Sequence, residues 1–301
     1  MKLCWSSDQA VVNGLQLNWE TTGAVSGEPL LMVMGLGGQL IHWPDALCEA
    51  LVARGFRLIR FDNRDAGLSA EADRGLPTRI PQDWLRGRFG WQAQSNYTLM
   101  DLARDTEGLM DLLSLPRAHL VGVSMGGMVA QVLAATRPAR VSSLTAIMTS
   151  TNHPRLPVAR FDVLWRMAGL GPRPQTREAV IRRTTGMLQR VGSPGYPTPL
   201  DYRRRLAGRA YDRAFRPRGV ARQTHAIVAT GSFEPLLADI RAPTQVVHGL
   251  ADPLLRPACG QRCAQVIPGA RLELVAGMGH DFALPLMPRW AELIGDNAGR
   301  A

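Results

Sequence analysis

The sequence predicts an α/β fold in which helices flank a mostly parallel central sheet and a helical cap is inserted. Short apolar strand candidates alternate with helix candidates up to about Ser150, which favours a parallel sheet covered on both faces. The alternation stops over residues 151–230, which are rich in Arg, Pro and Gly and contain only helical fragments. It resumes at Gln245. We therefore assign residues 1–150 and 231–301 to a core and residues 151–230 to the cap.

The core begins with a hairpin. Asn13-Gly14 is the strongest short hairpin signal, and it separates two strand candidates. Gly55 follows the first helix candidate and is typical of a helix end. The elements expected in this part are strands at Gln9–Val12, Leu15–Thr21, Leu30–Met34 and Arg57–Phe61, and a helix at Trp43–Ala53.

The middle of the core is expected to start with a long loop. Residues Glu71–Asn96 contain Pro77, Pro81 and several glycines, so at most one short helix is expected there. Thr98 has the residue type of a helix N-cap, and Asp101 stands three positions later, where a capping box needs an acceptor. The elements expected next are helices at Leu99–Leu113 and Met128–Ala135, and strands at Ala118–Val121 and Val141–Met148.

The cap and the last part of the core complete the assignment. In the cap we expect helices at Arg160–Met167, Arg177–Val191, Pro199–Ala214 and Arg218–Ala229. After it we expect strands at Gln245–His248 and Arg271–Val275, and helices at Ala258–Val266 and Leu286–Asn297.

The net charge is +10, and the excess lies in one segment. Residues 153–222 hold 16 arginines and only four acidic residues, Asp162, Glu178, Asp201 and Asp212. Either arginine replaces lysine throughout, since Lys2 is the only lysine, or the segment attracts an anionic substrate. The arginines occur with Pro and Gly and form no nucleic-acid motif, so no nucleic-acid partner is expected.

Composition also bears on location and cofactors. No apolar run is long enough to span a membrane, and the first residues lack an apolar stretch of signal-peptide length, so we expect a cytoplasmic protein without stable membrane insertion. The four cysteines are expected to be reduced thiols. Cys259 and Cys263 have no histidine or second cysteine pair nearby, and neither a metal nor a cofactor is indicated.

Gly122-Val123-Ser124-Met125-Gly126-Gly127 is the strongest chemical signal. It lies between a strand candidate and a helix candidate, where the pattern Gly-x-Ser-x-Gly forms a sharp turn with the serine at its apex. The start of the helix then offers free N–H groups and the positive end of its dipole to a developing oxyanion. Ser124 is therefore a candidate nucleophile.

A serine hydroxyl needs a base, and the base needs an acid that orients it. Of the six histidines, His280 follows the last strand candidate within a glycine-containing loop, whereas His248 lies inside a strand and is expected to be packed. Asp252 follows the preceding strand. The carboxyl ends of parallel strands gather at one edge of an open sheet, and the order Ser, Asp, His is typical of one arrangement of a catalytic triad.

Two further loops follow buried strands. The glycine-rich segment Gly35–Gly38 either turns backbone N–H groups toward a ligand or is an ordinary turn into a helix. It is not a phosphate-binding loop, because no Gly-Lys-Ser/Thr follows. In the polar turn Asp62–Ser69, we expect Asp62 and Arg64 to pair and fix the turn.

Along almost its full length, the chain resembles the α/β-hydrolase family. The motifs that carry the resemblance are Met34–Gly38, Asp62–Ser69, Gly122–Gly127, Gly249–Asp252 and Gly279-His280. Trp43-Pro44 and the Asn63-Arg64-Asp65 turn most resemble the branch that includes aclacinomycin methylesterase and other small carboxylesterases.

The resemblance implies an α/β-hydrolase fold with Ser124 as nucleophile, His280 as base and Asp252 as its orienting acid. It also implies that the backbone N–H groups of Leu36 and Met125 form the oxyanion hole. Many relatives have His-Gly where this chain has Met34-Gly35, so the hydrogen bonds of that histidine are lost here.

The function expected is hydrolysis of a small-molecule, hydrophobic carboxylic ester through an acyl-enzyme. Trp43 and Trp165 are candidate pocket residues, and the cap is expected to choose the substrate with Trp165, Met167, Met187, Leu188, Tyr196 and Tyr202. A cofactor-free perhydrolase or haloperoxidase and a carbon–carbon bond hydrolase use the same triad and remain alternatives. A ligand receptor with residual hydrolase activity is a further one. The sequence does not indicate an oligomeric state.

Overall fold

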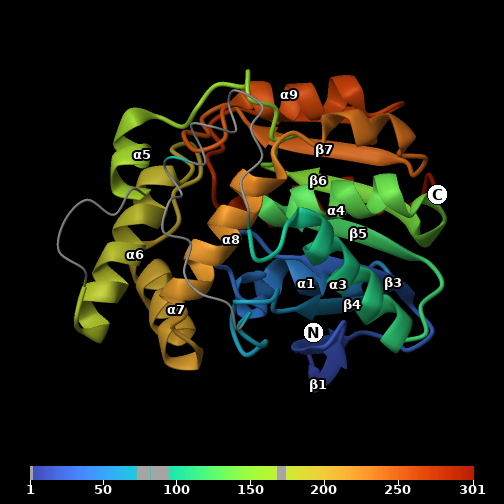
Figure 1. The fold of residues 1–301 in the computed structure, drawn as a ribbon, viewed down its shortest axis with the longest axis horizontal. Helices are drawn as coiled ribbons and strands as arrows, with labels where there is room; N and C mark the ends of the chain where they lie inside the picture. The colour runs from blue at the N-terminus through green and yellow to red at the C-terminus, as the bar shows by residue number, and fades with distance from the viewer. Residues whose placement is uncertain (1–2, 73–81, 83–94, 168–173) are drawn as a thin grey trace.

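A computed structural model describes residues 3–72, 82, 95–167 and 174–301. One eight-stranded sheet runs through it, in the order β1-β2-β4-β3-β5-β6-β7-β8 (Figure 1). Its strands are β1 (Ser6–Val12), β2 (Leu15–Thr22), β3 (Glu28–Val33), β4 (Phe56–Phe61), β5 (Ala118–Val123), β6 (Val141–Ile147), β7 (Thr244–Gly249) and β8 (Arg271–Val275). The strands from β4 to β8 in this order pair in parallel, while β1 and β2 are antiparallel, so the predicted fold class is confirmed.

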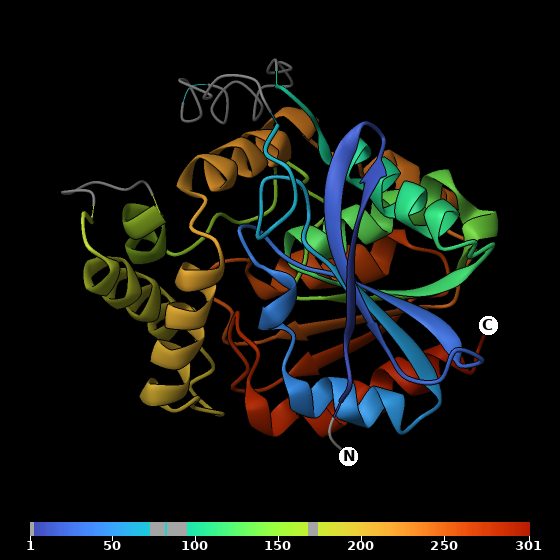
Figure 2. The same ribbon diagram turned by 90° about the horizontal axis from the view of Figure 1, so that it is seen from below.

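Helices cover both faces of the sheet. On one face lie α1 (Asp45–Val52) and α10 (Met287–Ala298), which pack against each other along the sheet (Figure 2). On the other lie α3 (Leu99–Leu112), α4 (Met125–Thr136) and α9 (Pro257–Val266). Each of these helices was expected from the sequence, with bounds that differ by at most a few residues.

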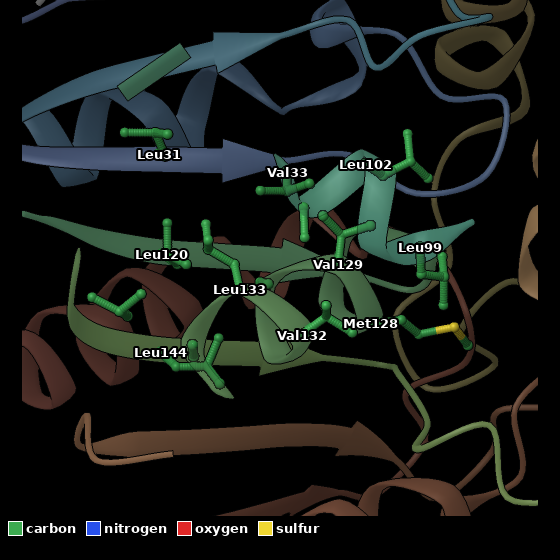
Figure 3. Packing of buried hydrophobic residues seen from close by; sticks show 14 of the residues in the cluster. Leu31, Val33, Leu99, Leu102, Leu120, Met128, Val129, Val132, Leu133 and Leu144 are labelled. Atoms are coloured by element: carbon green, nitrogen blue, oxygen red, sulfur yellow. The ribbon is translucent and has the colours of Figure 1, made fainter. Parts of the chain in front are cut away.

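The strands divide their side chains between two cores, because successive residues of a strand point to opposite faces. In β3, Leu31 and Val33 join the core under α3 and α4, whereas Leu30 and Met32 join the core under α1 and α10. Figure 3 shows the first of these cores, in which Leu120 and Leu144 meet the apolar side of α4. Burial on both faces explains why these strands are continuous apolar runs.

Local signals at two element ends behave as expected. Asn13 and Gly14 have φ angles of 50° and 77°, the left-handed conformation that a two-residue hairpin turn requires. Thr98 caps α3 in a capping box with Asp101, whose Oδ2 accepts the Thr98 N–H at 2.8 Å.

Between β6 and β7 the chain forms α5 (Phe161–Met167), α6 (Arg177–Val191), α7 (Leu200–Arg213) and α8 (Pro217–Thr230), called the cap helices below. A 3-10 helix, η3 (Glu234–Asp239), leads back to β7. The cap helices lie at the edge of the sheet where the parallel strands end (Figure 2). The domain boundaries at residues 150 and 231 stay predictions.

Part of the predicted loop Glu71–Asn96 lies outside the described residues. The side chain of Met167, which was predicted to line the pocket, is not described either. Within the described ranges, no helix is both long and apolar enough to cross a membrane.

Candidate active site

Ser124 stands at the apex of the turn between β5 and α4. Its φ of 53° is unusual for a residue with a side chain and is the strained conformation expected at such an apex. The flanking glycines are required by contact. A Cβ on Gly122 would lie 2.3 Å from the carbonyl oxygen of Gly126, and a Cβ on Gly126 would lie 2.0 Å from that of Val33. Any larger residue at either position would therefore displace backbone.

The structure brings Ser124, His280 and Asp252 into one hydrogen-bonded chain. The Ser124 Oγ lies 3.0 Å from His280 Nε2, and His280 Nδ1 lies 2.6 Å from Asp252 Oδ2. A carboxylate can only accept, so His280 Nδ1 carries the proton and Nε2 is left to accept from the serine hydroxyl. The imidazole is thus held in the tautomer that can take a proton from Ser124.

Asp252 is buried and its carboxylate is fully engaged. Its Oδ1 accepts the N–H groups of Leu254 and Leu255 at 2.8 and 2.9 Å, and its Oδ2 faces His280. Only 1% of the residue is exposed. A buried carboxylate must have its oxygens hydrogen-bonded, and these contacts satisfy both of them.

His248 lies behind Asp252 in β7 and is fully buried. Its Nε2 donates to the Leu255 carbonyl at 2.8 Å and lies 3.5 Å from Asp252 Oδ2. Among the described residues its Nδ1 has no hydrogen-bond partner, so the expectation of a packed histidine holds but only one ring nitrogen is satisfied. Burial lowers the pKa of His248, which favours the neutral ring.

The glycine segment Gly35–Gly38 and the start of α4 both adjoin Ser124. A Cβ on Gly35 would lie 3.1 Å from the Ser124 Cβ, so the segment after β3 packs directly on the serine. Met125 is the first residue of α4, and a first-turn N–H has no partner within its helix. Within the described part of the chain, the N–H groups of Leu36 and Met125 donate to no protein acceptor.

The cap helices α7 and α8 also hold the glycine segment and the residue that follows it. Gln223 of α8 is fully buried, accepts the Gly37 N–H at 2.8 Å and donates to the Arg64 carbonyl at 2.7 Å. Val220 lies over Gly37, where a Cβ would come within 2.8 Å of its side chain. Gln39 donates to the carbonyls of Ala210 and Ala214 at the end of α7, each at 2.8 Å.

The expected pair of Asp62 and Arg64 is wrong. Asp62 is fully buried, with Oδ2 2.8 Å from Arg213 of α7, and it also accepts the Leu40 N–H at 2.8 Å. Arg64 instead makes a bidentate pair with Asp105 of α3, with both N···O distances at 2.6 Å. The turn is fixed as expected, but its two charged residues point to different partners.

The cap also holds the loop that carries His280. Ser193, just after α6, donates from its hydroxyl to Asp281 Oδ1 at 2.6 Å and accepts the Gly279 N–H at 2.8 Å. The His280 N–H donates to the Val191 carbonyl at 2.7 Å. Both neighbours of His280 are therefore fixed by the segment that follows α6, which sets the position of the imidazole.

Ser193 and Gln223 escaped the sequence analysis. Each supports the site through partners in a different part of the chain, and a single serine or glutamine in a helical segment carries no motif. No signal in the sequence pointed to them, because the burial of Asp281, which requires donors, is seen only in the structure.

The structure separates the two candidate pocket residues. Trp43 is 1% exposed and packs edge-on against Phe282, with ring centroids 5.3 Å apart, in the core under α10. Trp165 is 54% exposed on α5 beside Phe161. Val163 takes the buried side of that short helix, and a residue two positions later lies on the opposite side. Neither tryptophan is among the residues lining the one cavity described below.

Among the described residues, no group of three His, Cys, Asp or Glu side chains could hold a metal ion. The side chains that the structure joins at Ser124 are a hydroxyl, a base with a fixed tautomer and an acid.

Comparisons with known proteins identify the family of the chain. The family model described as alpha/beta hydrolase fold matches residues 28–284. The chain is 30% identical over 273 residues to a protein of Variovorax paradoxus (strain S110) that is named as a carbamate hydrolase, RutD, covering 88% of this chain and 90% of that one. It is 27% identical over 286 residues to the rhodomycin D methylesterase DnrP of Streptomyces peucetius, covering 89% of each.

Among solved structures, the enol-lactonase from Burkholderia xenovorans LB400 superposes with a TM-score of 0.73 at 24% identity, covering 97% of this chain and 100% of that one. A variant of the meta-cleavage product hydrolase CumD from Pseudomonas fluorescens superposes with a TM-score of 0.75 at 20% identity, covering 98% of each. At these identities the similarity shows a shared fold and nothing beyond it.

Proposed function

The chain belongs to the α/β hydrolase fold family, and on that premise we propose that it is a serine hydrolase that cleaves a carboxylic ester through an acyl-enzyme. The observation that carries the proposal is the hydrogen-bonded chain from Ser124 Oγ through His280 to Asp252, with distances of 3.0 and 2.6 Å. The methylesterase among the relatives supports an ester as the substrate class.

In the proposed reaction, Ser124 Oγ attacks the ester carbonyl carbon while its proton passes to His280 Nε2. The carbonyl oxygen becomes an oxyanion, which the N–H groups of Leu36 and Met125 stabilise; one such donor is worth about 10²- to 10³-fold in rate. The tetrahedral intermediate then expels the alcohol oxygen, which takes the proton from His280. An acyl group remains on Ser124.

Deacylation repeats these steps with water. His280 removes a proton from a water molecule, whose oxygen attacks the acyl carbon. The second tetrahedral intermediate breaks its bond to Ser124 Oγ, which regains the proton, and the carboxylic acid leaves. Asp252 stays ionised and stabilises the imidazolium that forms in both halves.

A carbamate is the second candidate substrate. Its carbonyl undergoes the same attack, and the relative named as a carbamate hydrolase is 30% identical to this chain. The perhydrolase alternative differs only in the acceptor, hydrogen peroxide in place of water, so the same assay can include it. The carbon–carbon bond hydrolase alternative differs in the bond broken and needs a substrate of its own.

Kinetics with p-nitrophenyl esters of increasing acyl length, an N-alkyl carbamate and an ester with added hydrogen peroxide test the proposal. Wild type should turn over the esters fastest, and Ser124→Ala should lose about 10³-fold or more in kcat. Ser7→Ala, on the exposed strand β1, is the matched control and should be unchanged. Ester hydrolysis by a folded Ser124→Ala protein at the wild-type rate would exclude the mechanism. Faster turnover of the carbamate than of every ester would make a carbamate the substrate class in place of an ester.

A further inference from the structure

A cavity of about 420 Å³ lies outside the proposed triad, between the cap and the loop that carries Asp252. Its walls come from the end of α6, the segment leading to α7, and the two residues that flank Asp252, Ala251 and Pro253. Neither Ser124 nor His280 is among the residues described as lining it. The cavity is therefore separate from the reacting serine, although it touches the acid's own loop.

The cavity is lined by cations. Among the described lining residues, three are arginines, Arg160, Arg190 and Arg203, and none is acidic. Arg160 and Arg190 share one carboxylate, that of Asp162, at 2.9 and 2.6 Å. Among the described residues, the one acidic partner of Arg203 is Asp281. Two aspartates thus face three guanidinium groups, and one positive charge is left without a counter-charge.

Donors at the cavity wall are also left over. Arg203 is 9% exposed, and its contact with Asp281 is a single one of 3.4 Å, too long for a strong charge-assisted bond. Within the described ranges, this is the one side-chain hydrogen bond that Arg203 makes, so its guanidinium keeps further N–H groups for a ligand. Thr198 lines the same cavity at 7% exposure, and its Oγ1 has no partner among the described residues. A buried hydroxyl without a partner is rare in folded proteins, so the Thr198 Oγ1 marks this part of the wall as unusual.

The rest of the wall is apolar. Pro194, Pro197, Leu200, Ala251 and Pro253 contribute carbon surface. A cavity of this volume with a few polar groups among apolar ones suits an organic molecule better than a small inorganic ion. The fork of an arginine matches a planar carboxylate.

We propose that this cavity is a binding site for an organic monocarboxylate, whose carboxylate is held by Arg203 and Arg190 and whose carbon skeleton lies against the proline-rich wall. The site is independent of the reaction catalysed at Ser124. The carboxylic acid that ester hydrolysis releases belongs to the class of ligand that the cavity would bind.

Calorimetric titration of the full chain with benzoate, and with benzamide as its neutral counterpart, tests the site. Benzoate should bind and benzamide should not. Arg203→Gln and Arg190→Gln should each weaken benzoate binding about tenfold or more, the loss expected for one charge-assisted hydrogen bond. Arg205→Gln, at an exposed position on the same helix outside the lining, is the control and should bind as wild type does. Because Arg190 is exposed, its variant remains informative if Arg203→Gln does not fold.

Two further titrations separate the site from the proposed triad. Benzoate should bind equally to Ser124→Ala, whereas binding that is lost in this variant would place the ligand at the serine and overturn the proposal. Inorganic phosphate that binds as tightly as benzoate would also overturn it, because the cavity would then be an unselective anion site. If Ser124→Ala loses catalysis but still binds benzoate, the result supports both the proposed reaction and the proposed binding site, and each can fail without the other.

Discussion

Ser124 is held in its strained conformation by bonds from both sides. Its N–H donates to the Ile147 carbonyl at 3.0 Å. Its own carbonyl accepts the Thr149 hydroxyl at 2.8 Å and the N–H groups of Gly127 and Met128 in the first turn of α4. A positive φ on a residue with a side chain costs about 1–3 kcal/mol, so it persists only where the surroundings impose it. The neighbouring glycines make the turn possible, and these bonds make it stable.

His248 gives the stability of the protein a pH dependence. Burial lowers its pKa from the ordinary 6.5, so the folded protein keeps the ring neutral where the unfolded chain binds a proton. The contribution is fully present above about pH 6.5 and is lost as the pH falls toward the folded pKa, with a slope of up to about 1.4 kcal/mol per pH unit. Burial lowers the pKa values of His42 and His119 too, so the wild-type slope has several sources.

Urea unfolding of wild type and of His248→Gln between about pH 7.5 and pH 5.5 measures this contribution. The variant should lose stability less steeply with falling pH, whatever its stability at the upper limit. His153→Gln, at a partly exposed position, is the control and should keep the wild-type slope. Identical slopes for wild type and His248→Gln would contradict the assignment.

For single residues, the positions of side chains that follow strands could be predicted from the sequence. The partners of the charged side chains could not. Ser124, Asp252 and His280 each come after a parallel strand, and the topology alone brings such positions to one edge. Asp62 also follows a strand, but its partner Arg213 lies in α7. Nothing in the sequence near Asp62 distinguishes that arginine from the others in the cap.

Among the elements, α8 is the one that joins the cap to the glycine segment. Gln223 accepts the Gly37 N–H and donates to the Arg64 carbonyl, so it fixes the backbone beside the proposed oxyanion donor Leu36. We expect Gln223→Ala to lower kcat about tenfold with little change in KM, because the lost alignment matters mainly in the transition state. Gln223→Glu keeps an acceptor for Gly37 and should recover part of the loss.

Steady-state kinetics of these variants on one ester measure the effect. Thr224→Ala is the matched control, since Thr224 is the next residue of the helix and its hydroxyl bonds only to the Val220 carbonyl. An unchanged kcat in Gln223→Ala, or an equal loss in Thr224→Ala, would remove the positioning role.

Element bounds were predictable where end signals are strong. The expected helix Arg177–Val191 and the expected strand Arg271–Val275 coincide with α6 and β8. The Thr176 hydroxyl accepts the Ala179 N–H at the start of α6, and Gly192 follows its end. The face that a cap helix buries was not predictable. Trp165 was assigned to a pocket, yet it lies on the exposed side of α5, because the identity of a residue does not say what its helix packs against.

Across the whole molecule, the basic cap and the acidic turn after β4 neutralise each other. Arg213 pairs with Asp62, Arg216 with Glu71, and Arg222 with both Asp65 and Glu71. Part of the positive excess seen in the sequence is therefore used to dock the cap helices on the core. This contribution was invisible in the sequence, where the two segments lie far apart.

The buried pair of Arg222 and Asp65 should therefore be important for stability. Arg222→Met leaves the fully buried Asp65 carboxylate without its cation and should lower the free energy of unfolding by about 3–5 kcal/mol. The double variant Arg222→Met with Asp65→Asn removes both charges and should recover much of that loss. Chemical denaturation of the three proteins gives both values.

Arg177→Met is the control for this comparison. Its pair with Asp212 is half exposed, at 44% and 55% of the side chains, and such pairs contribute little to stability. Losses of equal size in Arg177→Met and Arg222→Met would show that burial of the pair does not matter. A double variant less stable than Arg222→Met would show that the cost is not an uncompensated charge.

The central claim is that Ser124 forms a covalent bond to the substrate's acyl group, and a fluorophosphonate tests it most directly. The intact mass of the protein should rise by one phosphonyl group as ester hydrolysis is lost, and peptide mapping should place that group on Ser124. Ser124→Ala should remain unlabelled under the same conditions. A phosphonyl group on another residue, or hydrolysis that continues in fully labelled protein, would contradict the account.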